Sequence, residues 1–137
     1  MAEINPGEGV DAVTRTEPNE TGSSTPKVVS YLETAAHGVA DAAGDCVVML
    51  GVVPASSTWF IERMSVQNNS VLVSTFALYR DRVSELTRKS ATPAGNDDIE
   101  DASSPIWFAS GSTVLAVWDG CTPGAICYVN SQIRVEG

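Results

Sequence analysis

The densest group of possible ligands in this 137-residue sequence is an acidic segment that contains Asp97, Asp98, Glu100 and Asp101. Calcium binds several oxygen atoms that converge from a flexible loop, so these carboxylates are a candidate calcium site. Their spacing does not follow the D-x-[DN]-x-[DN]-G loop, and a solvated acidic loop is the alternative. Two of these acids could form a glycosidase pair, but no aromatic residue lies within five positions to stack on a sugar.

The chain contains three cysteines and one histidine, which limits thiol and imidazole chemistry. Cys121 and Cys127 flank a Pro-Gly turn signal, so the two thiols could approach each other across a hairpin. Zinc would need two further ligands, and only His37 and Cys46 remain. We expect reduced cysteines that pack as small apolar residues, with a disulfide formed after release from the cell as the alternative. We expect His37 to be an ordinary loop residue.

No nucleophile elbow, phosphate-binding loop or dinucleotide-binding motif occurs in the chain. The sequence therefore predicts no catalytic residue, no bound cofactor and no enzyme activity. Aromatic residues are the remaining candidates for a binding surface, because an exposed ring on a sheet can stack on a sugar or anchor a protein interface. We name three interface candidates: Trp107, on a short predicted strand next to the acidic segment; Tyr31, the first aromatic residue; and Arg15.

Composition limits the class of protein and the class of partner. The chain has the length of one domain, with 43 % apolar and 18 % charged residues, which is enough apolar material for a core. Eight Lys and Arg against seventeen Asp and Glu give a net charge of −9. Such a surface repels phosphate backbones and anionic lipid, so we expect no nucleic-acid partner and no membrane partner. No secretory leader is recognisable, which favours synthesis in a reducing cytosol.

Short runs of β-branched and aromatic residues predict an all-β fold. The predicted strands, separated by turn signals, are 46–53, 59–67, 71–80, 106–109, 113–119 and 127–135. In the last of these, apolar and polar residues alternate with a period of two. We predict an antiparallel β-sandwich of the jelly-roll type.

Other segments carry weaker signals. Residues 28–33 could form a short strand, and the small residues of 34–44 favour a loop or a helical turn. In the long interruption 81–105, the part around Val83 and Leu86 could add an edge strand, and the rest is predicted to be loop.

The first 27 residues are predicted to form an extended acidic arm, with the sandwich over 28–137. The arm contains five acids, two cations and no aromatic residue, so it cannot bury a face of its own. Extended, it would span up to about 90 Å, against a radius of gyration of about 14 Å for the domain. We therefore expect an ordered arm to lie on another subunit.

From Trp59 to Glu136 the order of landmarks resembles the β-sandwich virion proteins of tailed bacteriophages. The landmarks, spread over roughly 78 of the 137 residues, are the Trp59 strand, Phe76-Ala77-Leu78-Tyr79-Arg80, Gly95-Asn96-Asp97-Asp98, Ser104-Pro105-Ile106, Val114-Leu115-Ala116-Val117-Trp118 and Asn130 to Glu136. The resemblance implies a structural protein of the virion, made in the host bacterial cytoplasm and carrying no catalytic residues.

Within that group we expect a capsid decoration or head-stabilising protein. It would bind the major capsid protein or other virion proteins through the arm and the sandwich. We also expect a homo-oligomer, with a trimer as the guess for its symmetry. The alternative is a receptor- or glycan-binding module of a phage tail or fibre, with Trp107 and the acidic segment as its patch.

Overall fold

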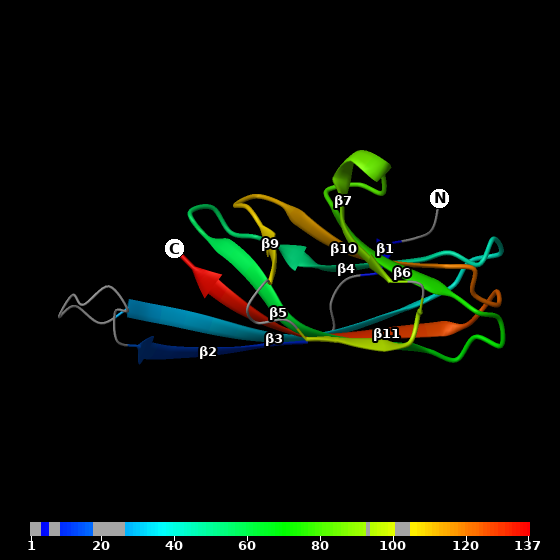
Figure 1. The fold of residues 1–137 in the computed structure, drawn as a ribbon, viewed down its shortest axis with the longest axis horizontal. Helices are drawn as coiled ribbons and strands as arrows, with labels where there is room; N and C mark the ends of the chain where they lie inside the picture. Colours follow the sequence, from blue (N-terminus) through cyan, green and yellow to red (C-terminus); the bar gives the residue numbers. More distant parts are fainter. Residues whose placement is uncertain (1–3, 6–8, 18–26, 93, 101–104) are drawn as a thin grey trace.

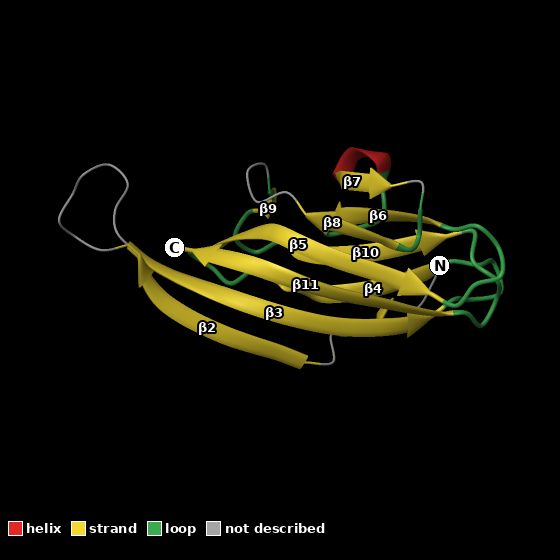
Figure 2. Ribbon diagram, turned by 60° about the horizontal axis from the view of Figure 1, so that its bottom comes forward, coloured by secondary structure: helices red, strands yellow, loops and turns green. Residues whose placement is uncertain are grey.

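The computed structural model describes residues 4–5, 9–17, 27–92, 94–100 and 105–137. Sheet A has the strand order β1-β4-β10-β6-β7, formed by β1 (Ile4–Asn5), β4 (Cys46–Val52), β10 (Thr113–Asp119), β6 (Thr75–Arg80) and β7 (Arg88–Thr92). Sheet B has the order β2-β3-β11-β5-β8, formed by β2 (Gly9–Glu17), β3 (Lys27–Val39), β11 (Ile126–Glu136), β5 (Thr58–Asn68) and β8 (Asp97–Glu100), and β9 (Ile106–Phe108) also pairs with β5. Figures 1 and 2 show the two sheets stacked as layers. The predicted antiparallel β-sandwich is confirmed.

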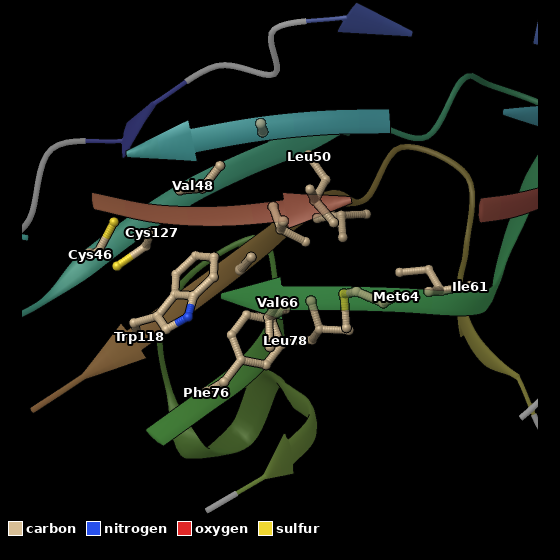
Figure 3. Packing of buried hydrophobic residues seen from close by; sticks show 14 of the residues in the cluster. Cys46, Val48, Leu50, Ile61, Met64, Val66, Phe76, Leu78, Trp118 and Cys127 are labelled. Carbon is tan, nitrogen blue, oxygen red and sulfur yellow. The ribbon is translucent and has the colours of Figure 1, made fainter. Parts of the chain in front are cut away.

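The main apolar core fills the space between the sheets (Figure 3). It follows from alternation along each strand, since successive side chains of a strand point to opposite faces. In β11, for example, Cys127, Val129 and Ile133 are fully buried, whereas Tyr128 and Asn130 between them are exposed. This is the period of two that the sequence predicted.

Trp118 of β10 is the largest fully buried side chain. Its ring meets Phe76 of β6 edge-on at a centroid distance of 4.9 Å, and its Nε1 donates a hydrogen bond to the Gly95 carbonyl at 3.0 Å. The indole N–H is thus satisfied inside the core, where an unpaired donor would cost free energy. The same bond ties the segment before β8 to the centre of sheet A.

β3 is longer than the sequence indicated. The loop or helical turn expected over 34–44 is wrong for its first part, because the strand continues to Val39 and pairs with β11 along its length. The small residues that suggested a loop alternate, and Thr34, Ala36 and Gly38 are buried. Small side chains here fit the close approach of the sheets, so this stretch reflects packing and not a turn.

Three further expectations are corrected by the structure. Residues 71–74 belong to a loop before β6 and not to the strand predicted over 71–80. In the interruption, Glu85–Thr87 form a short 3-10 turn, η1, followed by β7. Residues 97–100, predicted as loop, form β8 and pair with β5 from Asp97↔Val66 to Glu100↔Arg63. Backbone pairing decides such edge strands, and their polar side chains do not reveal it.

The N-terminal segment contributes two strands, β1 and β2, to the sheets. β1 pairs in parallel with β4, and β2 pairs with β3 from Gly9↔Ala35 to Glu17↔Lys27. The described backbone of the expected arm therefore extends both sheets of its own chain, and its contact with another subunit stays a prediction. A strand at a sheet edge has unpaired N–H and C=O groups, and a polar segment can satisfy them without burying a face. In the described part of the chain, no helix is long and apolar enough to cross a membrane.

Candidate functional site

A line of aromatic residues crosses the outer face of sheet B. The strand register pairs Tyr31 of β3 with Arg134 of β11, Arg134 with Phe60 of β5, and Phe60 with Trp107 of β9. Residues directly opposite each other in a sheet point to the same side. We call these four residues the aromatic row.

Burial confirms that the row faces outward. Trp59 and Ile61, on either side of Phe60, are buried in the core, and Phe60 itself is half-buried. Phe108 is fully buried, whereas Trp107 next to it is 52 % exposed. The row therefore ends in an exposed ring, Trp107, and its other two rings, Tyr31 and Phe60, are half-buried.

Arg134 is held in place between the two halves of the row. Its guanidinium lies over the Phe60 ring at 4.9 Å from the centroid. Two carboxylates flank it, with Glu136 at 3.5 Å from Nη2 and Glu62 at 3.9 Å from Nε. The strand register shifts at this point, leaving Glu62 as an extra residue between the pairs of Ile61 and Arg63. Such a bulge re-aims a side chain, and here it brings the second carboxylate to Arg134.

Lys89 of β7 reaches across from the edge of sheet A to Trp107. Its ammonium lies 4.2 Å from the centroid of the Trp107 ring and 5.6 Å from that of Phe108. Burial, followed by the nearby charge of Arg80, lowers the pKa of the Lys89 ammonium. A cation over the ring favours one orientation of the indole, and half of the indole remains open to solvent.

Polar residues lie in the next positions along the same face. The register pairs Glu33 with Gln132 and Gln132 with Arg63, one step from the aromatic row. Four residues further along β11, Tyr128 pairs with His37, and their rings lie 6.0 Å apart. His37 is therefore on a strand and not in the loop that we expected. Hydrogen-bonding groups beside an apolar strip are the usual composition of a small-molecule site.

Two of the three interface candidates lie on this surface, at opposite ends of the aromatic row. Tyr31 and Trp107 lie in the same row, although 76 positions separate them in the sequence. Arg15 lies on β2, where it pairs with Val29, and its side chain is outside the described residues. Phe60 and Arg134 were missed as site residues. Their outward position was readable from alternation, but their alignment depends on which strands are neighbours.

The structure gives little support for a calcium site in the acidic segment. The backbone of Asp97, Asp98 and Glu100 lies in β8, and an extended strand does not wrap around an ion as a loop does. The side chains of these three residues, and all of Asp101, lie outside what the structure describes. Among the described residues, no three His, Cys, Asp or Glu side chains gather as a metal site would require.

The three cysteines are free thiols buried in the core. Cys121 and Cys127 approach to 3.9 Å between their sulfur atoms, which agrees with the proximity predicted across the turn. The hydrogen bond with Cys46, followed by burial, raises the pKa of the Cys127 thiol, and burial raises that of Cys121. Both groups are therefore neutral at physiological pH and are poor nucleophiles.

No protein-family model and no curated protein sequence matches the chain. Among solved structures, it is similar to the C-terminal family 6 carbohydrate-binding module of a laminarinase from Zobellia galactanivorans, with 11 % identity, a TM-score of 0.39, and 94 % of this chain and 100 % of that chain covered. It is also similar to a xylan-binding family 22 module from Paenibacillus barcinonensis, with 13 % identity, a TM-score of 0.25, and coverage of 93 % and 85 %. A third is the family 36 module of a xylanase from the hindgut metagenome of Trinervitermes trinervoides, with 8 % identity, a TM-score of 0.30, and coverage of 94 % and 98 %.

Proposed function

We propose that this chain is a non-catalytic glycan-binding module and that sugar rings stack on the aromatic row. The observation that supports this proposal is the alignment of Tyr31, Phe60 and Trp107 across the outer face of sheet B. Neighbouring strands are about 4.8 Å apart, so the row from β3 to β9 is about 14 Å long. A strip of that length suits several sugar units of an oligosaccharide.

The chemistry of the row fits a sugar better than it fits a catalytic reaction. The face of an aromatic ring is negative and attracts the C–H groups of a sugar ring. Gln132 and Arg63 lie one step away along the strands, where they can hydrogen-bond to hydroxyl groups. Arg134 is held by Glu62 and Glu136, so its charge is largely matched within the protein. This arrangement favours neutral sugars over anionic ones.

Glycan-array binding followed by calorimetry tests the proposal. The wild-type chain is expected to bind at least one oligosaccharide, and Trp107→Ala is expected to weaken that binding by about tenfold or more, as expected for an aromatic anchor. Tyr79→Ala is the control, because Tyr79 is a partly exposed aromatic residue of the other sheet, on β6 of sheet A. An array with no bound glycan, or equal losses in the two variants, would contradict the proposal.

A structural role in a phage virion, expected from the resemblance, is the second proposal. What favours it is exposed apolar surface away from the aromatic row, notably Val71, Leu72 and Val73. Exposed apolar surface of this kind marks protein–protein contacts, which a virion component would make. Purified heads that lack this protein should then bind it with saturation, and Trp107→Ala should bind as the wild type does. Failure of the wild type to bind such heads, necks or tails counts against this role.

A further inference from the structure

Two buried thiols approach each other at the end of the sandwich where β10 connects to β11. The sulfur atoms of Cys121 and Cys127 are 3.9 Å apart. A disulfide needs a sulfur–sulfur distance of about 2.05 Å, so the two atoms must come about 1.9 Å closer. Rotation of the two side chains, together with a small movement of the turn, can supply a shift of this size. The two thiols are therefore placed to bond to each other.

The turn that carries Cys121 can adjust, whereas Cys127 is fixed. Cys127 lies in β11 and pairs with β3 on one side and with β5 on the other. Cys121 lies outside the strands, in the turn 120–125, in which Pro123 and Gly124 are exposed. A surface turn opens at a lower free-energy cost than paired strands do. Opening of this turn can therefore bring Cys121 to solvent without separating the sheets.

Cys46 is the competing partner for Cys127. Figure 3 shows both side chains in the core, Cys46 on β4 of sheet A and Cys127 on β11 of sheet B. Cys46 pairs with Trp118 of β10, so both of these cysteines belong to paired strands. Neither can advance toward the other without moving its strand, and no such restraint acts on Cys121. The structure therefore favours a bond between Cys121 and Cys127.

We propose that Cys121 and Cys127 form a disulfide by exchange with a low-molecular-weight disulfide such as oxidised glutathione. Opening of the turn exposes Cys121, which loses its proton to water as a solvated thiol does, and its sulfur attacks the small disulfide. The products are a mixed disulfide at Cys121 and a small thiolate, which takes up a proton and leaves as a thiol.

Closure of the turn completes the exchange. The Cys127 sulfur attacks the Cys121 sulfur, and the proton of Cys127 passes to the departing thiolate. Two protein thiols are thereby oxidised, and one small disulfide is reduced to two thiols. Because the closed turn keeps both thiols neutral and buried, the rate of the reaction depends on how often the turn opens.

The turn is also bonded to the loops around it. Figures 1 and 2 show the connecting loops gathered at this end of the sandwich. The Cys121 amide donates to the Gly44 carbonyl at 3.0 Å, and the Gly124 amide donates to the Ala40 carbonyl at 2.9 Å. A disulfide from Cys121 to β11 would therefore also restrain the segment between β3 and β4.

Thr122 connects the turn to the loop before β6. Its hydroxyl accepts from the Val71 amide at 3.0 Å and from the Leu72 amide at 3.3 Å. The Ser70 hydroxyl accepts from the Thr122 amide at 2.8 Å and donates to the Leu72 carbonyl at 2.9 Å. We therefore expect the disulfide to stiffen the exposed loop at 71–73 as well as the turn.

Peptide mapping of the oxidised protein tests the proposal. The folded, reduced chain is incubated with oxidised glutathione, the remaining thiols are blocked with N-ethylmaleimide in denaturant, and the chain is digested with trypsin. No Lys or Arg separates Cys121 from Cys127, so both lie in peptide 90–134, whereas Cys46 lies in peptide 28–63. We expect peptide 90–134 to carry no label and to be lighter than its reduced form by two hydrogen atoms. Peptide 28–63 should carry one label.

Two variants test the choice of partner. Cys46→Ala is the matched control, because it removes another buried thiol and should leave the disulfide in place. In Cys121→Ala, both remaining thiols are expected to stay reduced, and thermal unfolding checks that each variant folds. Three labelled thiols in the wild type, a disulfide that joins the two peptides, or a lasting glutathione adduct would each overturn the proposal. These three outcomes are read from the wild type, so they do not depend on the folding of a variant.

Hydrogen exchange measures the expected stiffening. Oxidation should slow exchange of the Val71, Leu72 and Thr122 amides by about tenfold, and a reductant should reverse the effect. The Thr87 amide of η1, which donates to the Ser84 carbonyl, is the internal control. Equal exchange in the two redox states would overturn the stiffening. Glycan binding by the aromatic row is expected to be the same in both states, so the disulfide and the proposed function fail separately.

Discussion

The outer faces of the two sheets both carry apolar residues, but they use them differently. On sheet A, Val47, Leu115 and Val117 form a cluster, and Leu115 is only 2 % exposed between Met49 and Tyr79. On sheet B, the rings of the aromatic row are partly or largely exposed. A side chain that its neighbours already cover contributes to stability, whereas one left open can contribute to binding. Exposure, more than apolar character, therefore distinguishes the outer face of sheet B from that of sheet A.

The largest loss of stability is expected for a substitution in the core between the two sheets. Trp118→Ala should lower the free energy of unfolding by about 3–5 kcal/mol, because it leaves a large cavity. It also removes one of the two donors to the Gly95 carbonyl, which then accepts only from the Asn68 side-chain amide. Urea denaturation measures the loss, and Trp118→Phe should cost less because most of the volume remains. A loss below about 1 kcal/mol for Trp118→Ala would mean that the core collapses around the site.

The next prediction separates the two faces directly. Leu115→Ala should cost about 2–5 kcal/mol of stability, as for other buried leucines, and should leave glycan affinity unchanged. Phe60→Ala should cost less stability, because Phe60 is only half-buried, and should weaken glycan binding. Denaturation and calorimetry on both variants give the comparison. If Phe60→Ala costs as much stability as Leu115→Ala, the distinction between the faces is lost.

A smaller effect is expected from the arginine in the row. Arg134→Gln should reduce glycan affinity several-fold, because Phe60 loses the cation that lies over its ring. Stability should also fall, by about 1–3 kcal/mol, because the mostly buried carboxylates of Glu62 and Glu136 lose the cation between them. Arg80→Gln, which breaks an exposed pair with Asp81, is the control on sheet A and should leave glycan binding intact. If calorimetry shows a larger loss of glycan affinity for Arg80→Gln than for Arg134→Gln, the aromatic row is not the glycan-binding surface.

The smallest predicted effect concerns pH at the end of the sandwich where Cys121 lies. The hydrogen bond with Asp119, burial and nearby charges raise the pKa of Asp45 above its usual value of 3.8. The native state therefore binds more protons than the unfolded state between 3.8 and the raised pKa, and this carboxyl makes stability rise as pH falls through that window. Asp45→Asn should be slightly more stable than the wild type at neutral pH, and the difference should fade below that window. Thermal unfolding across pH measures it, and a difference that grows on acidification would reverse the sign.

Local patterns predicted the strands that have one clear buried face. The alternation in β11 and the runs that form β4 and β10 reveal their burial directly. Trp107 was also singled out for exposure, because it lies on a short strand near the acidic segment. Such signals come from neighbouring residues, which is why a single sequence contains them.

Features that depend on long-range pairing could not be read in the same way. The aromatic row requires β3, β11, β5 and β9 to lie side by side, and nothing in the local pattern specifies that order. β2 and β8 join sheet edges through backbone groups, so their polar residues looked like an arm and a loop. The bulge that brings Glu62 to Arg134 depends on strand register, which no single strand encodes.

The way in which the loop before β6 is held has a practical consequence. Ser70 and Thr122 fix its backbone, and the side chains at positions 71–73 are apolar and take no part in these hydrogen bonds. The support and the tip are therefore separate, so the tripeptide can be exchanged without altering the frame. This site suits the display of foreign sequences, and a library built there would sample binding specificity on an otherwise constant scaffold.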